Sequence, residues 1–292
     1  TKFVRGMLVD TKPTTFDELI RISGLSHGTD VWLGNAQTLI EQGTVTLTEA
    51  ICCRDDIMIY LIKQGLPPNS AFKIMETVRK GKALKDPAKW EEYKNLMKEH
   101  NVPDWYIKSC EKIKYMFPKA HAAAYVTNAF RIAWFKVHKP EAYYAAFFSI
   151  RAADDFDSEI MCFGKEKVKN KMKEIDLLGN NATPKDKTMY PVLELVLEMY
   201  ERGINFLPID LYKSHSTKFL VEEGGIRPPL NSIPGLGTVA AQGIEKARQE
   251  GKFMSIDDMK IRSKVGDSVA ELLKKFGCLD GMSQSNQISL FG

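Results

Sequence analysis

The first residues that could do chemistry lie at the start of a helix that the sequence predicts for residues 119–138. Lys119 and His121 fall in its first turn, where unpaired backbone amides and the positive end of the helix dipole favour an anion. Tyr125 follows His121 by one turn on the same face, and Arg131 lies farther along the helix. Such a face could hold a triphosphate while the aromatic ring faces a base. The alternative is that the neighbouring alanines serve close helix packing and that His121 is only a surface cap.

A second candidate is a Gly-x-Gly turn, IPGLGTVAA at 233–241, which leads into a predicted helix. Two glycines let the backbone press against a phosphate, and the amides that open the next helix point toward it. This pattern is typical of a helix-hairpin-helix motif, which binds the duplex backbone and reads no bases. It predicts DNA contacts at the turn, namely Gly235, Leu236, Gly237 and Thr238.

Two alternatives compete for this turn. The letters GLGTVA also satisfy the G-x-G-x-x-A pattern of dinucleotide-binding proteins, but the preceding RPPLNSIP cannot be a buried parallel strand, because proline breaks the hydrogen-bond ladder. A plain helical corner is the other alternative. Downstream, SKVGDSVA at 263–270 resembles a degenerate second copy with one glycine instead of two, which predicts contacts from Lys264 and Gly266 or, equally, a packing role.

The motifs that usually carry catalysis are absent from the sequence. There is no phosphate-binding G-x-x-x-x-G-K-[ST] loop, no H-E-x-x-H zinc motif, no G-x-S-x-G nucleophile turn and no cysteine–histidine metal spacing. Asp155 and Asp157 have the alternate spacing that two-metal phosphoryl transfer uses, but Asp154 and Glu159 crowd them and no apolar alternation marks a strand. We therefore predict no catalytic residue and no metal ligand within this chain.

The charge is unevenly distributed along the 292 residues. The net charge is +4, yet residues 1–59 carry 5 basic and 8 acidic side chains, whereas residues 60–139 carry 16 basic and 7 acidic. A basic middle suggests nucleic acid or nucleotide phosphate as a partner, and Arg54, Arg79 and Lys82 supply cations at helix ends. The alternative is a solvated, lysine-rich helical surface.

Cysteine usage and hydropathy indicate a soluble chain from a reducing compartment. The five cysteines form no C-x-x-C pair and their number is odd, so a disulfide framework is not expected. No run reaches the roughly 18 apolar residues of a membrane span, and the start, TKFVRGMLVD, has no signal-peptide pattern and no initiator Met. We predict a cytoplasmic location, no membrane partner, and a sequence that begins within a longer protein.

Most of the elements that position these residues are predicted to be helices. Thr15 and Glu18 form a capping box for a first helix, and further helices are predicted at 34–42, 47–64, 68–80, 87–100, 103–115, 119–138, 140–150 and 190–202. Short extended runs at 204–210 and 217–222 predict a small β element before the last helices. The expected fold class is therefore mainly α, with a helical domain at 1–150, a small α+β domain at 151–280 and a tail at 281–292.

Taken together, these segments resemble a known family. GLSHGTDVWLGNAQ (24–37), CRDDIMIYL (53–61), FKIMETVRKGK (72–82), FPKAHAAAYV (117–126), the Gly-x-Gly hairpin and the terminal QISLF occur in this order in the C-terminal part of the PolC-type alpha subunit of bacterial DNA polymerase III. The resemblance covers essentially the whole chain. It implies that 1–150 is the fingers domain, which closes over the incoming deoxynucleoside triphosphate (dNTP), and that 151–280 is the domain that binds duplex DNA.

The resemblance also implies roles for individual residues. Around the incoming nucleotide it places Ser26, His27, Phe117, Lys119, His121 and Tyr125, with Arg54, Arg79 and Lys82 as phosphate or template contacts. The implied activity is that of a DNA-directed DNA polymerase, a nucleotidyltransferase, with primer–template DNA and dNTP as partners. The palm carboxylates that hold two Mg²⁺ ions come earlier in the family's sequence, so this chain alone is not expected to polymerise DNA.

The last segment, QISLF, looks like the short peptide with which bacterial polymerases bind the ring-shaped beta sliding clamp. The family implies clamp contacts from Gln287, Ile288, Ser289, Leu290 and Phe291, in which the glutamine anchors by hydrogen bonds and the last two residues fill an apolar cleft. Other replisome subunits are further expected partners. The alternative for the tail is a terminus with accidental apolar residues.

Two other classes of protein remain as alternatives. A non-enzymatic adaptor that binds DNA and the clamp would use the same hairpin and tail, but it has no need of a triphosphate pocket at 117–131. A helix-hairpin-helix repair glycosylase requires a catalytic Asp or Lys beyond the hairpin; Asp257 and Asp258 have about that position, but no apolar and aromatic pocket lining is evident. Nucleotide binding is the observation that separates an adaptor from a polymerase.

Overall fold

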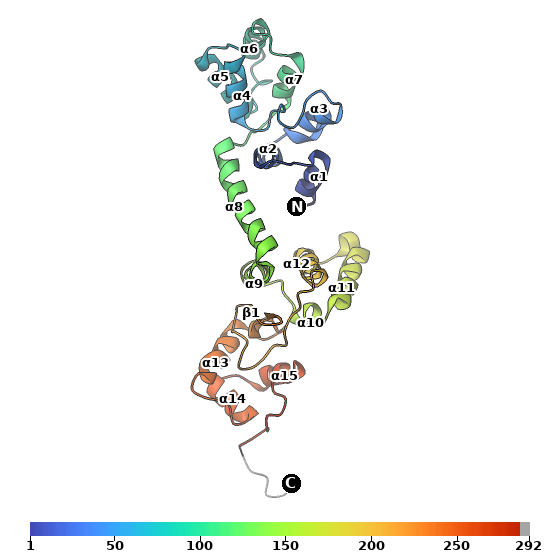
Figure 1. Ribbon diagram of the computed structural model, residues 1–292, viewed down its shortest axis with the longest axis vertical. Coiled ribbons are helices and arrows are strands. Elements are labelled where there is room, and N and C mark those ends of the chain that lie inside the picture. Colours follow the sequence, from blue (N-terminus) through green and yellow to red (C-terminus); the bar gives the residue numbers. More distant parts are fainter. Residues whose placement is uncertain (287–292) are drawn as a thin grey trace. The chain divides into compact units, whose positions relative to one another are not determined.

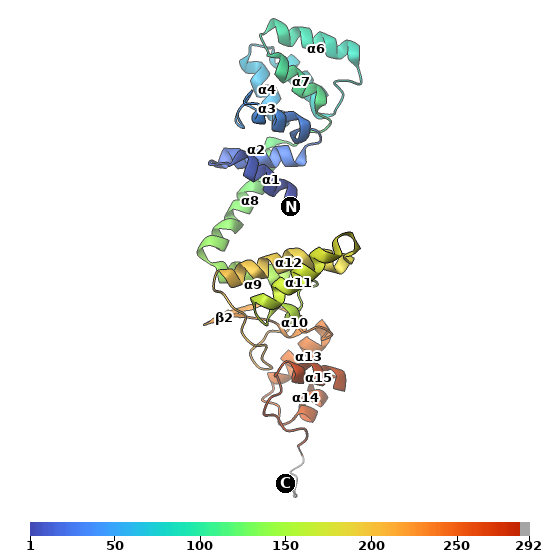
Figure 2. The same ribbon diagram turned by 90° about the vertical axis from the view of Figure 1, so that its right-hand side faces the viewer.

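The computed structural model describes residues 1–286, and within them the chain is mainly helical, as the sequence predicts (Figure 1, Figure 2). Fifteen α-helices and one two-stranded sheet occur in this range. The contacts divide the chain into two compact units, the first made of residues 1–131 and the second starting at residue 132. This division falls within helix α8 (Lys119–His138), whereas the sequence suggested a domain boundary at residue 150.

The first unit is built from short helices joined by tight connections. They are α1 (Lys2–Thr11), α2 (Phe16–His27), the π-helical turn η1 (Trp32–Ala36), α3 (Gln37–Glu41), α4 (Arg54–Lys63), α5 (Pro68–Arg79), α6 (Pro87–Glu99), α7 (Asp104–Lys112) and the first part of α8. The predicted capping box is confirmed at the start of α2. The Glu18 amide donates to Thr15 Oγ1 (3.3 Å), and the Thr15 amide donates to Glu18 Oε2 (2.9 Å).

The helix predicted from residue 47 begins later, at Arg54. The carboxylate of Asp56 accepts hydrogen bonds from the backbone amides of Cys52 (3.2 Å) and Cys53 (2.8 Å), which precede the helix. A first-turn carboxylate that bonds back to these amides satisfies donors that would otherwise be unpaired and so fixes the N-terminus of the helix at this point. Residues 47–50 form turns instead.

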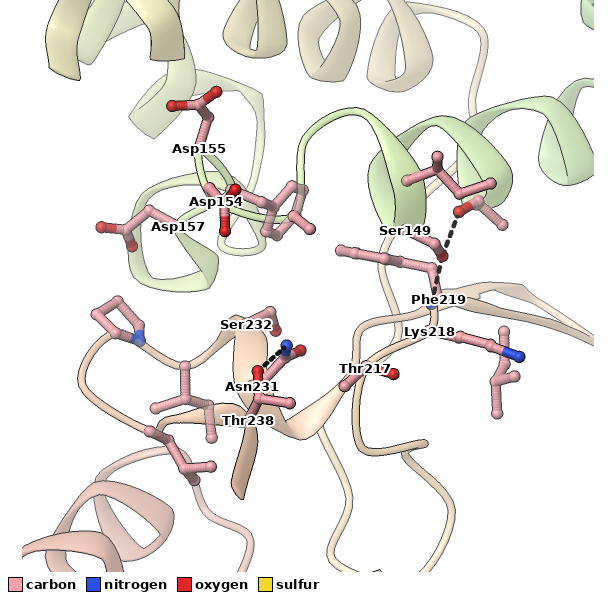
Figure 3. Close-up of a pocket in the computed structure, with 18 of the residues that line it drawn as sticks. Ser149, Asp154, Asp155, Asp157, Thr217, Lys218, Phe219, Asn231, Ser232 and Thr238 are labelled. Carbon is pink, nitrogen blue, oxygen red and sulfur yellow. Dashed lines mark hydrogen bonds between the residues drawn. The ribbon is translucent and has the colours of Figure 1, made fainter. Parts of the chain in front are cut away.

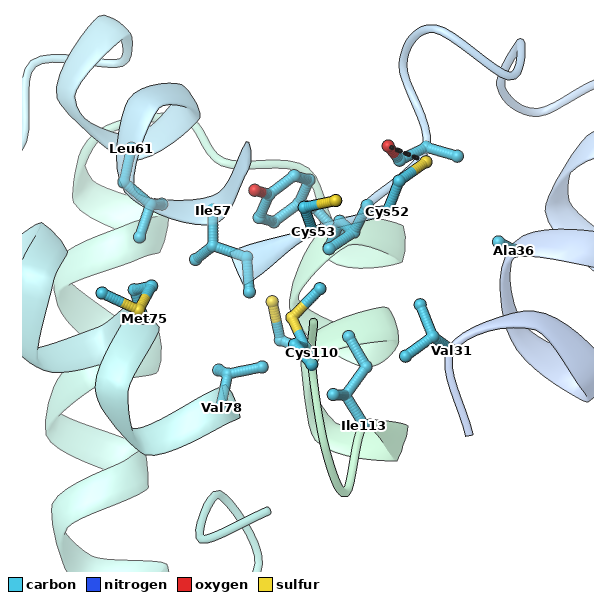
Figure 4. Packing of buried hydrophobic residues seen from close by; sticks show 14 of the residues in the cluster. Val31, Ala36, Cys52, Cys53, Ile57, Leu61, Met75, Val78, Cys110 and Ile113 are labelled. Carbon is cyan, nitrogen blue, oxygen red and sulfur yellow. Dashed lines mark hydrogen bonds between the residues drawn. The ribbon is translucent and has the colours of Figure 1, made fainter. Parts of the chain in front are cut away.

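The core of the first unit surrounds α4 and α5, which pack against each other (Figure 4). Ile57 and Leu61 from α4 and Val78 from α5 are fully buried there, together with the thiols of Cys53 and Cys110. Burial raises the pKa of the Cys53 thiol to about 12, so this sulfur packs as an apolar group and does not act as a nucleophile at neutral pH. The core therefore holds the CRDD segment rigidly against its neighbours.

The first half of the second unit is also helical, and a small sheet follows it. Its elements are α9 (Pro140–Ile150), α10 (Ser158–Met161), α11 (Lys165–Leu178), η2 (Gly179–Asn181), α12 (Pro184–Glu201), β1 (Leu220–Glu222) and β2 (Gly225–Arg227). The two strands are antiparallel with Val221 opposite Ile226, which confirms a β element in the predicted run at 217–222. The run at 204–210 contributes only an isolated bridge from Phe206 to Ile226. Phe148, Phe156 and Phe219 form an aromatic core beneath the sheet.

The second half of this unit is a compact set of short helices with its own core. They are η3 (Leu230–Ser232), α13 (Thr238–Arg248), α14 (Ile256–Ser263) and α15 (Asp267–Lys275). Ile244, Met259 and Leu273 are fully buried between them. α13 and α14 approach closely, because a Cβ atom at Gly243 would lie 2.6 Å from the carbonyl oxygen of Ser263. This close packing holds the hairpin formed by η3 and α13 beside the hairpin formed by α14 and α15.

Candidate functional site

Two segments that are distant in the sequence lie side by side in the first unit. The Thr29 amide donates to the Tyr115 carbonyl (2.9 Å), and the Lys114 amide donates to the Thr29 carbonyl (3.1 Å). Gly24 allows this half of the site to approach α4, because a Cβ atom there would lie 2.4 Å from Cys53 Sγ and 2.7 Å from the Cys52 carbonyl oxygen. The GLSHGTD and FPKAHAAAYV segments therefore lie next to each other in the fold.

Four predicted nucleotide-site residues form a continuous row of rings on these two segments, which we call the aromatic row. His27 stacks on Phe117 with ring centroids 4.9 Å apart and an interplanar angle of 27°. Phe117 meets His121 edge to face at 5.3 Å, and His121 lies 4.9 Å from Tyr125. Tyr125 is 64% exposed, so the end of the row is open to a ligand. Exposed rings at this spacing offer faces on which a nucleobase can stack.

Ser26 supports the first ring of the row. Nδ1 of His27 lies 2.8 Å from the Ser23 carbonyl oxygen and 2.9 Å from Ser26 Oγ. Because a carbonyl only accepts, the first contact requires a proton on Nδ1, and Nε2 is then the nitrogen that remains for a ligand. Ser26 itself donates to the Ser23 carbonyl (3.0 Å). Its position favours a role in orienting His27.

Lys119 lies beside the row but is surrounded by carboxylates that the sequence analysis did not assign to the site. Its backbone amide donates to Asp55 Oδ2 (2.7 Å), so one of the first-turn amides expected to be available for an anion is already occupied. Its Nζ lies 3.4 Å from Asp17 Oδ1 and 3.8 Å from Asp56 Oδ1. The CRDD motif drew attention to Asp55 and Asp56. By contrast, no residue near Asp17 in the sequence predicted that Asp17 would lie close to Lys119.

Arg21, which lies in α2, forms ion pairs with two of the same carboxylates. Its Nε lies 2.8 Å from Asp17 Oδ2, and its Nη1 lies 3.9 Å from Asp56 Oδ2. The hydrogen bond from Arg21, followed by the charges of Arg21 and Lys119, holds the pKa of Asp17 below its usual range. Two cations and three carboxylates thus meet at the start of α8, and an incoming triphosphate would have to exchange with the carboxylates to reach Lys119.

The remaining predicted cations differ in how close they lie to the aromatic row. Arg54 is adjacent, because its backbone amide donates to the Phe117 carbonyl (3.2 Å). Arg79 is paired through Nη2 with Glu76 Oε2 (2.9 Å), while its carbonyl accepts from the Met116 amide (3.3 Å). Lys82 and Arg131 are exposed, and no described contact brings either of them to the row.

The predicted hairpin of the second unit is a glycine turn that leads directly into a helix. Gly235 has φ +88°, a conformation that side chains other than glycine rarely adopt, and Gly237 caps the start of α13. Nothing lies within 4 Å of a Cβ atom built on Gly237, and residues 237–239 are exposed, so the start of α13 is open to solvent. Leu236, which we expected at the DNA, is buried in the core, so its side chain anchors the turn and only its backbone faces outward.

The degenerate copy repeats this backbone geometry with different charges. Lys264 takes the left-handed position with φ +55°, where the first turn has Gly235, and Gly266 caps α15 as Gly237 caps α13. Asp267 then stands where the first hairpin has Thr238, and it pairs with Lys260 Nζ at 2.7 Å. A carboxylate at this helix start opposes phosphate binding. The two hairpins are therefore alike in fold and unlike in electrostatics.

A cavity of about 1100 Å³ lies next to the first hairpin (Figure 3). Ser149 spans one wall, since its Oγ accepts from the Phe219 amide (2.9 Å) and donates to the Ala145 carbonyl (2.7 Å). Asp155 accepts from Thr188 Oγ1 (2.6 Å), and Asp157 accepts from the first amides of α10. These carboxylates are used in structural hydrogen bonds, and residues 1–286 contain no group of His, Cys, Asp and Glu side chains placed to hold a metal ion.

Among the described helices, none is long and apolar enough to cross a membrane.

Comparison with known families assigns the two units to a class of protein. Residues 1–101 match the family described as the bacterial DNA polymerase III alpha subunit finger domain, and residues 203–288 match the helix-hairpin-helix motif. The chain therefore contains one region similar to a polymerase finger domain and another similar to a helix-hairpin-helix motif, as the resemblance predicted.

Individual relatives give a closer comparison. Over 292 residues the chain is 58% identical to the PolC-type DNA polymerase III of Clostridium perfringens, and over 291 residues it is 58% identical to that of Bacillus subtilis and 53% identical to that of Listeria monocytogenes. Each match covers 100% of this chain and 20% of the relative. Over its whole length the chain is similar to PolC-type DNA polymerase III, and it spans about a fifth of the length of these relatives.

Proposed function

We propose that this chain is the part of a replicative DNA-directed DNA polymerase that binds the incoming dNTP and the product duplex. The observation that carries the proposal is the aromatic row from His27 to Tyr125, with Lys119 beside it, in a region that matches a polymerase finger domain. A row of exposed rings next to a cation suits a ligand that has both a base and phosphates.

In this proposal the row contacts the base or sugar, and Lys119 and Arg21 contact the triphosphate. Phosphate oxygens would replace the carboxylates of Asp17 and Asp56 around Lys119, because these carboxylates lie 3.4 Å and 3.8 Å from Lys119 Nζ and are loosely paired with it. At Arg21 the phosphate would compete with the tighter hydrogen bond to Asp17 (2.8 Å). Positioning and charge neutralisation are the main contributions a protein makes to phosphoryl transfer. The Mg²⁺ ions expected of a polymerase would be held by a part of the longer relatives that this chain does not represent.

The hairpin at 235–238 would hold one strand of the product duplex by its backbone. The amides at the start of α13 and the open space at Gly237 support contact with a phosphate, and the second hairpin would add Lys264 and Gly266. Such binding should be independent of sequence and should weaken steeply as salt rises.

The sliding-clamp contact remains a proposal from sequence. Gln287, Ile288, Ser289, Leu290 and Phe291 lie outside the residues that the structure describes. A tail that binds a clamp would convert repeated rebinding into an intramolecular event and so raise processivity. Binding of a peptide with residues 283–292 to purified beta clamp, compared with the same peptide carrying Leu290→Ala and Phe291→Ala, tests this contact. Other replisome subunits and a cytoplasmic location belong to the same proposal.

The decisive experiment is primer extension by the full-length polymerase that contains this segment, carrying His121→Ala or Lys119→Ala. Apparent affinity for dNTP is recorded separately from affinity for primer–template, with Lys73→Ala, an exposed lysine of α5, as the control. We expect dNTP affinity or the incorporation rate to fall by about tenfold or more while DNA affinity holds. If both variants behave like the control, the nucleotide assignment is wrong and the chain is better interpreted as a DNA and clamp adaptor.

A further inference from the structure

A separate cavity of about 590 Å³ lies in the first unit. It is lined by the turn at 44–51, by α4 and by the start of α7, and Arg21 and Lys119 reach it from α2 and α8. Its lining does not include any ring of the aromatic row. The volume lies within the range of roughly 300–1000 Å³ that small-molecule sites occupy.

One wall of this cavity is aromatic. The rings of Tyr60 and Tyr106 are stacked with centroids 4.2 Å apart and an angle of 17°, and Trp105 meets Tyr106 edge to face at 5.4 Å. Tyr106 is fully buried, so it holds the other two rings in place, whereas Tyr60 and Trp105 are only half-buried. A planar ligand ring would find two pre-oriented aromatic partners here.

The charged groups of the wall favour an anion. Arg21, Lys63 and Lys119 contribute three positive charges, and Glu49 and Asp56 contribute two negative charges. Glu49 accepts from the Thr46 amide (2.8 Å), and Asp56 accepts from the Cys53 amide (2.8 Å). Arg21 and Lys119 are already paired with Asp17 and, more distantly, with Asp56. Lys63, by contrast, has no ion-pair partner among residues 1–286.

We propose that this cavity binds a small planar aromatic molecule that carries an anionic group. The ring would lie against Tyr60 and Trp105, and the anion would pair with Lys63 at the mouth and with Arg21 or Lys119 deeper in the wall. Arg21 and Lys119 are shared with the triphosphate contacts proposed above, but Tyr60, Trp105 and Lys63 are not, so the ring and the outer cation can be tested on the 292-residue chain without polymerase activity.

Three probes separate the ring from the charge: 1-naphthyl phosphate, the uncharged 1-naphthalenemethanol, and inorganic phosphate. Binding to the 292-residue chain is followed by calorimetry and by the NMR signal of the Trp105 indole, which the Trp105→Phe variant assigns. We expect 1-naphthyl phosphate to bind at least about tenfold more tightly than either half-probe, since ring stacking and ion pairing each contribute on the order of a factor of ten.

Two variants locate the site. Lys63→Ala is expected to weaken the binding of 1-naphthyl phosphate by about fivefold, which is the loss typical of one exposed ion pair. Lys98→Ala, in the equivalent last turn of α6, is the control and should leave this affinity unchanged. Ile59→Glu places a carboxylate on the wall at a side chain that is 46% exposed, so the fold should persist and binding should be lost. Equal binding by 1-naphthyl phosphate and 1-naphthalenemethanol, equal effects of Lys63→Ala and Lys98→Ala, or wild-type affinity in Ile59→Glu would each overturn the proposal.

Discussion

The backbone amide of Lys119 donates a hydrogen bond of 2.7 Å to the carboxylate of Asp55, which lies 64 positions earlier in the chain. Asp55 belongs to the first turn of α4, and Lys119 is the first residue of α8. One carboxylate thus fixes the start of α8 against α4 and occupies an amide that the sequence analysis left available for an anion. The orientation of the aromatic row depends on this contact, because Phe117 and His121 flank Lys119.

Replacing Asp55 should therefore loosen the start of α8. We expect Asp55→Ala to lower the free energy of unfolding by about 1–2 kcal/mol, the usual loss when a carboxylate that caps a helix is removed. Asp55→Asn keeps an acceptor oxygen and should lose less. Urea unfolding of the 292-residue chain measures both, with Asp154→Ala, whose carboxylate has no partner in the described part of the chain, as the control. Equal losses in Asp55→Ala and Asp154→Ala would contradict the role given to Asp55.

Gly24 should be intolerant of even a methyl group. Its Cβ would lie 2.4 Å from Cys53 Sγ and 2.7 Å from the backbone oxygen of Cys52, and the backbone cannot move aside cheaply. We expect Gly24→Ala to destabilise the chain by about 1–3 kcal/mol through overpacking. Gly6→Ala is the matched control, because it lies in α1 with nothing within 4 Å of its Cβ, and it should be neutral or stabilising by up to about 1 kcal/mol. Similar stability of the two variants would show that α2 does not approach the CRDD turn this closely.

Glu76 should make part of the stability depend on pH. Hydrogen bonds from Arg79 and then Lys80 lower the pKa of Glu76 from 4.5 to about 2. Because the folded pKa lies below the unfolded value, the stabilisation is fully present above about pH 4.5 and is lost as the pH falls toward 2. We expect Glu76→Gln to be less stable than the wild type near neutral pH, and the difference to vanish at about pH 2. Thermal unfolding across this range measures it, and a difference that stays constant would disprove the linkage.

The two hairpins should differ in DNA affinity because of one charge. Thr238→Asp gives the first hairpin the charge of the second, and we expect it to weaken binding of a short duplex by about tenfold, since like-charge contact with phosphate is costly. Asp267→Thr should strengthen binding, and Lys260 keeps Asp257 as a partner at 3.0 Å. Fluorescence anisotropy at several salt concentrations measures both affinities. If neither substitution changes the affinity, neither helix start contacts the DNA backbone.

Local signals in the sequence were sufficient for much of the fold. The capping box of Thr15 and Glu18, the glycine turn at 235–237 and the helical periodicity all depend on residues within a few positions of one another. The mainly α fold class and the β element near residue 220 were predicted correctly for the same reason. The family resemblance, which uses the order of several long motifs, was confirmed as well.

The tertiary structure alone decided how these local pieces meet. The aromatic row requires that Thr29 pair with Tyr115, and the carboxylate environment of Lys119 requires that Asp17 and Asp55 come from two other helices. Leu236 was expected at the DNA, but the core of the second unit draws its side chain inward. No local pattern encodes such contacts, because burial and long-range pairing depend on how whole elements pack and not on the spacing of neighbouring residues.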